Sequence, residues 1–446
     1  MRICVVYDCL YPHTVGGAER WYRNLAERLA RDGHEVTYLT LRQWKRRTDP
    51  GVPGVRVVAV APRMALYGGS GRRRILPPLV FGVGVLRHLL VRGRRYDAVH
   101  TASFPYFSVL AAAIARPLHR FRLVVDWHEI WTRHYWDEYL GRLGGWLGWR
   151  VQCLCVRVRQ DAFCFSQMTV ERLRVQGLRS EPRRLPGLYA GQRAAGEPAA
   201  PDPVVLFAGR HIPEKRVPLL VPALALLREH APELRGAFLG DGPERKAVLQ
   251  AIAKHELEGV VSAPGFVGAD ELEQALRRAL CLVLPSRREG YGLIVVEAAA
   301  AGTPSVVARA ADSAATELIE EGENGFVVES VEADVLAEAI LRVRNEGQAL
   351  RERTAAWFRR NADHLSLERS LSAVAASYAG TPRSAAPAQP EDGKEEGGEE
   401  DLNADDCERR ADRGQPLLPQ APEAPVDPGG DDDAAQHQAH DEDPGA

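Results

Sequence analysis

Residues 280–308 read LCLVLPSRREGYGLIVVEAAAAGTPSVVA, and this stretch decides the fold. The apolar run 280–284 predicts a buried strand, which a charged, glycine-broken loop and an alanine-rich helix follow before a second strand at 305–308. Glu289 lies in the loop and Glu297 in the helix. The free amides at a helix start form an anion site, and ionised carboxylates only accept hydrogen bonds. The stretch therefore suits a phosphorylated ligand that carries sugar and ribose hydroxyls, such as a nucleotide sugar.

The rest of the chain repeats this alternation of strands and helices twice. Strands are expected at residues 2–8, 35–40, 55–60, 98–101, 122–126 and 162–166, and then at 204–208, 236–239, 260–266, 305–308 and 325–328. The pattern predicts an α/β protein of two Rossmann-like, doubly wound parallel-sheet domains that face each other across a cleft. We expect an N-terminal domain over 1–187, a linker over 188–203, a C-terminal domain over 204–355, a C-terminal helix over 356–380 and a disordered acidic tail over 381–446.

The formal net charge of −3 conceals a strong asymmetry. Residues 1–190 carry a net charge of +17, residues 191–380 one of −6 and residues 381–446 one of −14. The basic half indicates an anionic partner, either a phospholipid surface or a lipid-diphosphate acceptor, or else an arginine-rich surface that is simply solvated. No nucleic-acid motif accompanies the charge, so nucleic acid is not an expected partner.

Composition also bears on the compartment. No apolar run of 18 residues predicts a membrane span, and the first strand follows Met1 without room for a signal peptide. The seven cysteines are scattered and lack zinc-ligand spacing, which is typical of reduced thiols. We expect a cytoplasmic protein, with peripheral contact to the cytoplasmic face of an anionic membrane as one option.

Two loops carry the phosphate-binding candidates. Gly16 and Gly17 follow the first strand, where glycine permits close backbone approach to a diphosphate, although a turn without a ligand explains them equally well. Arg210 and Lys215 stand five residues apart after the first strand of the second domain. There, two cations could hold a diphosphate leaving group.

His128 ends a strand of the first domain, between Asp126 and Glu129. A histidine in that position can donate to a sugar hydroxyl or move a proton, although a lone histidine is more often structural. Residues 127–149 hold five of the eight tryptophans, which suit a carbohydrate face, a membrane interface or the packing of a helix. No acidic metal motif ends a strand of either domain, so no metal site is expected.

Taken together and in order, these motifs resemble those of the retaining GT-B glycosyltransferases of family GT4. The resemblance covers about residues 1–380 and rests on GGAE at 16–19, GR at 209–210 with Lys215, GDGP at 240–243, the Glu289/Glu297 pair, GTP at 302–304 and NGF at 324–326. It implies that the N-terminal domain is the acceptor side, that the C-terminal domain binds the nucleotide sugar, and that the last helix crosses back onto the N-terminal domain.

The resemblance also implies residue roles. Glu289 would meet the hydroxyls of the transferred sugar and Glu297 the ribose, while Arg210 and Lys215 would hold the diphosphate. The backbone at Gly17 and at Gly292–Leu293 would assist, and His128 matches the family's histidine near the sugar.

The family transfers a hexose with retention from a UDP- or GDP-linked donor to a glycan, lipid-linked or small-molecule acceptor, without a cofactor or an essential metal. Two alternatives stay open at this point: a GT-B sugar-nucleotide epimerase or hydrolase, and a catalytically silent subunit that binds a nucleotide sugar.

Overall fold

The computed structural model describes residues 1–45, 50–66, 68, 73–191, 198 and 200–379. The N-terminal sheet has seven parallel strands in the order β3-β2-β1-β4-β5-β6-β7. Their bounds are β1 Arg2–Val6, β2 Glu35–Leu41, β3 Val55–Ala61, β4 Ala98–Ala102, β5 Arg122–Trp127, β6 Asp161–Cys164 and β7 Arg183–Arg184. The helices of this domain are α1 Gly17–Arg31, α2 Leu76–Arg92, α3 Phe107–His119, α4 Arg133–Arg157 and α5 Gln167–Val175, with the 3₁₀ turn η1 Gly93–Arg95 after α2.

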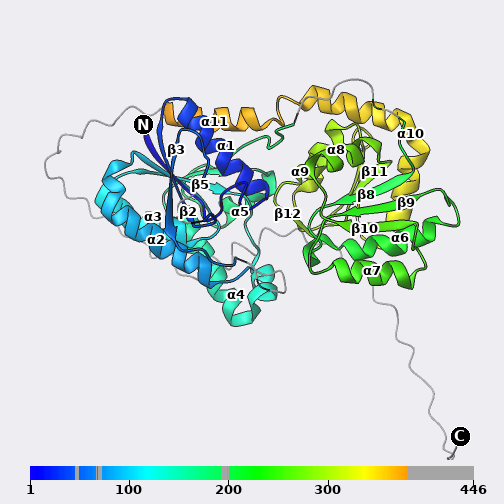
Figure 1. Cartoon of the computed structure of the whole chain (residues 1–446), viewed down its shortest axis with the longest axis horizontal. Helices are drawn as coiled ribbons and strands as arrows, with labels where there is room; N and C mark the ends of the chain where they lie inside the picture. Colours follow the sequence, from blue (N-terminus) through cyan, green and yellow to red (C-terminus); the bar gives the residue numbers. More distant parts are fainter. Residues whose placement is uncertain (46–49, 67, 69–72, 192–197, 199, 380–446) are drawn as a thin grey trace, which may run out of the picture.

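The C-terminal sheet has six parallel strands in the order β10-β9-β8-β11-β13-β15. Their bounds are β8 Val204–Ala208, β9 Arg235–Leu239, β10 Val261–Gly265, β11 Cys281–Leu284, β13 Ser305–Ala308 and β15 Gly325–Val328. Its helices are α6 Leu220–Leu227, α7 Arg245–Lys254, α8 Ala269–Arg278, α9 Leu293–Ala300 and α10 Ala333–Asn361, with the 3₁₀ turns η2 Pro213–Lys215, η3 Val217–Leu219 and η4 Ala315–Leu318. The short strands β12 Arg288–Glu289 and β14 Asp312–Ser313 pair separately. The predicted fold class of two doubly wound parallel sheets is confirmed (Figure 1).

Both sheets reverse their strand order beside their first strand, between β1 and β4 and between β8 and β11. Such a switch point opens a crevice at the carboxyl ends of the strands, where ligands of open α/β sheets bind. The Gly16–Gly17 loop follows β1 and the Gly209–Lys215 loop follows β8. The topology thus places both predicted phosphate loops at switch points.

The last helix, α11 (Leu367–Ala379), lies on the N-terminal domain beside α1 (Figure 1). Arg28 of α1 forms an ion pair with Glu368. The two connections between the domains also run side by side, because the backbone of Tyr189 is hydrogen-bonded to those of Leu365 and Leu367. The C-terminal segment therefore completes the N-terminal domain, and two adjacent chain segments connect the domains. Within the predicted linker, residues 192–197 and 199 lie outside the described residues, as does the tail over 381–446.

Several element bounds differ from the sequence prediction. The apolar pattern predicts a helix over residues 79–91. Helix α2 begins earlier, at Leu76, because Pro77 and Pro78 fit a first helical turn, whose amides have no helical acceptor in any case. A helix was only one of three interpretations of the tryptophans in segment 127–149, and α4 contains four glycines and a non-helical break at Gly141. One stretch of the described residues, Leu76–Arg95, is long and apolar enough to cross a membrane by length and composition alone. Here it packs on α3 and β3.

Candidate functional site

Lys215 and Glu289 form the centre of the candidate site. Lys215 ends η2, the 3₁₀ turn that follows β8, and Glu289 lies in β12 at the end of the loop from β11. The ammonium and the carboxylate form an ion pair, and their side chains are 19 and 12% exposed. Two groups predicted separately, one for a diphosphate and one for a sugar, therefore meet at one point. A bound diphosphate could pair with Lys215 in place of Glu289. The carboxylate oxygens of Glu289 would then be free to accept hydrogen bonds from hydroxyl groups.

The turn after β9 holds the Lys215 loop in place. The amide of His211 donates to the carbonyl of Asp241 over 2.9 Å, and the amide of Glu244 donates to the carbonyl of His211 over the same distance. The GDGP turn thus supports the loop that carries Lys215. Arg210 is exposed on this loop and has no ion-pair partner in the described part of the chain. Its guanidinium takes no part in the Lys215–Glu289 ion pair and can therefore bind an anion.

Helix α9 begins directly beyond Glu289. Gly292 caps it with a φ of 101°, a left-handed conformation that favours glycine, and Leu293 is its first residue. The first amides of the helix have no helical acceptor, so they can bind an anion. Glu297, in the second turn, is mostly buried; burial raises its pKa, and the positive charge of Arg20 on α1 opposes that shift. The charge of Arg20 shows that α1, whose N-terminal cap is Gly16 and whose first residue is Gly17, approaches this helix from the other domain.

His128 follows β5 and packs within the N-terminal domain. Its ring stacks on Phe165 with centroids 4.6 Å apart and an interplanar angle of 4°, and it meets Tyr22 edge-on. Burial lowers its pKa, although Asp126 and Glu129 act in the opposite direction. The ring is therefore neutral near pH 7, and its Nε2 atom is buried without a hydrogen-bond partner among the described residues. A neutral imidazole with one free nitrogen can exchange a hydrogen bond with a sugar hydroxyl.

Gly290 brings the two halves of the site together. A Cβ atom built on Gly290 would lie 2.5 Å from the backbone carbonyl oxygen of His128. The residue after Glu289 thus touches the residue predicted to act from the opposite domain. Glycine is required for this approach, since Cβ atoms do not occur at such distances in ordinary packing. The domains are closed on each other here.

A buried polar network is centred on Asp126, two residues before His128. Most of its members were not predicted from the sequence. The Nε2 atom of His100 lies 2.8 Å from Asp126 Oδ1, and the Trp21 indole donates to Asp126 Oδ2 over 2.7 Å. The other ring nitrogen of His100 lies 2.8 Å from the Tyr378 hydroxyl of α11. Burial by itself would raise the pKa of Asp126, but His100, His128 and the Trp21 N–H lower it. The one available signal was His100, a polar residue inside the apolar strand β4.

A second group of buried charges lies behind the Gly16–Gly17 loop. Asp8 is fully buried and forms an ion pair with Arg73. Burial raises the pKa of the nearby Glu19 carboxyl, Asp8 adds to that effect and Arg73 reduces it. From the sequence, Glu19 stands out only as a motif residue, and neither Asp8 nor Arg73 is a predicted site residue. The remaining signal was the position of Asp8, a carboxylate two residues past the end of the buried strand β1.

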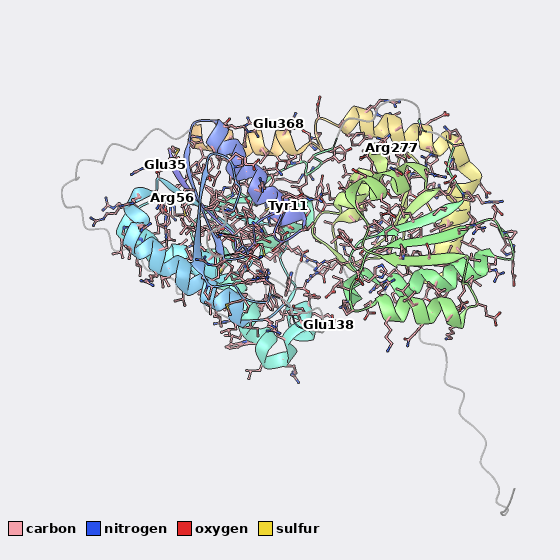
Figure 2. All side chains as sticks on the ribbon, in the orientation of Figure 1. Tyr11, Glu35, Arg56, Glu138, Arg277 and Glu368 are labelled. Atoms are coloured by element: carbon pink, nitrogen blue, oxygen red, sulfur yellow. The ribbon has the colours of Figure 1, made fainter. Side chains whose placement is uncertain are left out.

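Helix α4 reaches the C-terminal domain with aromatic and acidic side chains. The Tyr135 hydroxyl donates to Glu214 over 2.8 Å, and Arg287 pairs with Glu138 over 2.7 Å. The Arg288 guanidinium lies 4.2 Å from the centroid of the Tyr135 ring. Figure 2 labels Glu138 on the side of the N-terminal domain that faces its partner domain. Most of the aromatic segment 127–149 packs inside the domain, with Trp127, Tyr135, Trp136 and Trp149 buried.

A second set of polar contacts closes the interface at α5. The carboxylate of Glu317 accepts from the amides of Gln167 and Met168 at the start of α5, over 2.7 and 2.8 Å. Arg172, also on α5, pairs with Asp312 over 2.7 Å. Two groups of polar contacts, at α4 and α5, therefore hold the domains closed around the Gly290 approach.

The structure thus gathers the predicted residues on two facing sides. On the C-terminal side lie the two acids and two cations together with the helix start: Glu289, Glu297, Arg210, Lys215, Gly292 and Leu293. On the N-terminal side lie His128 and the Gly16–Gly17 loop. The arrangement combines cations, free amides, acceptor oxygens and a neutral imidazole, which are the groups needed to bind a diphosphate joined to a sugar.

Comparison with known proteins supports the same class. Residues 191–360 match the family model of glycosyl transferases group 1, and residues 16–187 match the glycosyl transferase 4-like domain, about three quarters of the chain together. A glycogen synthase of Mycobacterium tuberculosis is 27% identical over 419 residues, covering 87% of this chain and 97% of that protein. A D-inositol 3-phosphate glycosyltransferase of Streptomyces avermitilis is 33% identical over 184 residues, 39% of each chain.

Solved structures share the fold at lower identity. Sucrose-phosphate synthase from Thermosynechococcus elongatus superposes with a TM-score of 0.68 at 19% identity, over 85% of this chain and 98% of that one. Anabaena HepE, solved in complex with UDP and glucose, superposes with a TM-score of 0.64 at 20% identity, over 85% of this chain and all of that one.

Proposed function

Because the chain belongs to the GT4-type glycosyltransferases of GT-B fold, we propose that it transfers a hexose, with retention, from a UDP- or GDP-linked donor to a glycan, lipid-linked or small-molecule acceptor. The observation that carries the proposal is the Lys215–Glu289 ion pair at the start of α9, with the Gly290 loop against His128. Among the relatives by fold, HepE was also solved in complex with UDP-glucose, which is a donor of this chemical class.

The residues divide the work by charge. Lys215 and Arg210 hold the diphosphate, with the amides at Gly17 and at Gly292–Leu293. Stabilising the negative charge that builds up on this leaving group is the main electrostatic task of the site. The departing phosphate then takes the proton of the attacking hydroxyl on the same face of the sugar, so the reaction needs no protein nucleophile and no metal.

The carboxylates and the histidine position the sugar nucleotide. Glu289, once Lys215 turns to the diphosphate, accepts hydrogen bonds from the sugar hydroxyls, and Glu297 accepts them from the ribose. The raised pKa of Glu297 in the protein alone reflects burial, and hydroxyl donors would favour its ionised form. His128, neutral near pH 7, exchanges a hydrogen bond with the sugar near the reacting carbon.

A donor panel tests the proposal. The chain is incubated with UDP- and GDP-linked hexoses, with and without lipid-linked and oligosaccharide acceptors, and release of nucleoside diphosphate is measured. Acceptor-dependent release of UDP or GDP supports a transferase, and NMR of the product gives the anomer. Product of inverted configuration refutes retention, and loss of turnover in EDTA refutes metal independence. Release without any acceptor product would instead indicate a hydrolase.

The N-terminal domain also presents a face suited to an anionic membrane on the cytoplasmic side. Large apolar side chains are exposed along α2 and α4, including Leu76, Val83, Leu143 and Leu147. The first 190 residues carry a net charge of +17. Exposed apolar residues among arginines favour a peripheral contact with anionic lipid.

Vesicle flotation tests this contact. Binding to phosphatidylglycerol vesicles that weakens with salt supports it, and equal binding to neutral vesicles contradicts it. The acidic segment 381–446 carries a net charge of −14 and would compete for the basic domain. Its removal should therefore raise vesicle binding at low salt, and unchanged binding would refute that competition.

A further inference from the structure

A small basic cavity lies at the edge of the N-terminal sheet opposite to the candidate active site. It is bounded by Arg2, Glu35 and Arg56 at the amino-terminal ends of β1, β2 and β3, and by His88, Arg92 and Arg95 at the end of α2 and in η1. Its volume is about 40 Å³. Figure 2 shows Glu35 and Arg56 at the end of this domain that is turned away from the C-terminal domain. The cavity is therefore separate from the donor and acceptor chemistry described above.

Three of the four arginines around this cavity form no ion pair with another described residue. Arg2 pairs with Asp97 over 2.9 Å, which balances its charge. Arg56, Arg92 and Arg95 have no ion-pair partner within the described part of the chain. Glu35 supplies one opposing charge at the rim. A net excess of two positive charges therefore remains around a cavity of about 40 Å³.

His88 reports how strongly these charges act at the cavity. Its Nε2 atom lies 2.7 Å from the Tyr96 hydroxyl. Burial, together with the positive charges of Arg92 and Arg56, lowers its pKa to about 4. The ring is therefore neutral near pH 7 and can exchange a hydrogen bond without adding to the repulsion among the arginines.

We propose that this cavity binds a phosphate group, held by Arg56, Arg92 and Arg95 and remote from the reaction site. Planar guanidinium groups donate paired hydrogen bonds that match the oxygens of a phosphate. Three unpaired guanidinium groups around one cavity gain an electrostatic partner when such an anion binds, and an uncharged ligand would leave their repulsion in place.

The phosphate could be free in solution or part of a lipid headgroup. Leu90 and Val91, directly before Arg92, are 41 and 75% exposed, so acyl chains or glycerol could lie beside a bound headgroup. Both sources share the same chemistry at the three arginines, and the experiment separates them.

Calorimetry with inorganic phosphate tests the site. All proteins carry Arg210→Gln and Lys215→Gln, so that phosphate binding at the active site is weakened. In this background Arg92→Gln/Arg95→Gln should weaken phosphate binding at least about tenfold, because two guanidinium groups that donate charge-assisted hydrogen bonds to the phosphate are lost. Arg94→Gln is the matched control, since Arg94 is an exposed neighbour that does not line the cavity. Equal losses in the double variant and in the control, or no loss in either, overturn the proposal.

Two further measurements complete the test. Bound phosphate should raise the pKa of His88, followed by NMR of its ring protons, and an unchanged titration contradicts the site. Flotation on phosphatidylglycerol vesicles, compared with inorganic phosphate, then assigns the source. If Arg92→Gln/Arg95→Gln reduces flotation several-fold more than Arg94→Gln does, the site takes a lipid headgroup; if only inorganic phosphate responds, it takes a soluble phosphate. Turnover of Arg92→Gln/Arg95→Gln in the otherwise native chain should stay within about twofold, whatever the donor is.

Discussion

Replacing Gly290 by alanine should separate domain closure from folding. The new Cβ atom would lie 2.5 Å from the backbone carbonyl oxygen of His128, a group that cannot turn aside. Carbon–oxygen contacts between unbonded groups are normally about 3.3 Å or longer, so the loop and the opposite domain must separate by roughly 0.8 Å. Overpacking of this kind costs about 1–3 kcal/mol. The equilibrium constant for closure would fall roughly 5- to 150-fold, and turnover would fall by up to the same factor.

Three measurements check this prediction. Turnover of Gly290→Ala is compared with that of Gly268→Ala, because no atom lies within 4 Å of a Cβ built on Gly268. Thermal unfolding should change little, since the domains can part without disturbing either core. Small-angle scattering should show a larger radius of gyration. Turnover within about twofold of the native chain would refute the reasoning, and a loss of turnover without expansion would place the effect on Glu289 instead.

Three other changes follow from the same contacts. Lys215→Ala or Glu289→Ala should lower turnover at least about a hundredfold, the scale of losing one transition-state donor; near-normal turnover in both would remove them from the site. Tyr378→Phe leaves a buried nitrogen of His100 without its partner at 2.8 Å, and urea unfolding should show a loss of about 1–3 kcal/mol; a loss under about 0.5 kcal/mol contradicts this. The pKa of Asp126 is lowered in the folded protein. The ionised carboxylate therefore adds to the free energy of unfolding above about pH 4, and this contribution is lost as the pH falls through the pKa of the folded state. Asp126→Asn should therefore weaken the acid dependence of the unfolding free energy below about pH 4, and an unchanged dependence would refute the role.

The fold could be predicted because its information is local. Buried parallel strands are continuous apolar runs, and β8, β11 and β13 are of this kind. Loops that follow such strands meet at one edge of the sheet, so the loops around Lys215 and Glu289 could be placed together from sequence alone. The bounds of helix α4 could not be predicted, because its glycines and tryptophans obscure the helical period.

The residues that support the site could not be predicted in the same way. His100 and Tyr378 are 278 positions apart, and neither carries a motif. The Gly290–His128 approach depends on the relative placement of two domains, which no local pattern encodes. The sequence does mark His100 as unusual, since a histidine in an apolar strand must find a partner when it is buried. It does not say which residue provides that partner.

The docking of α11 on the first domain has a consequence for the synthesis of the chain. A ribosome produces the seven-stranded sheet first, and N-terminal domains usually fold as they emerge. Here His100 is hydrogen-bonded to Tyr378, and α1 forms an ion pair with Glu368. The first domain therefore reaches its final packing only after the second has been made. A chain that ended before residue 367 would contain both sheets but lack α11, so the surface of the first domain that α11 covers would be exposed. The packing of the first domain therefore depends on whether the last helix has been made.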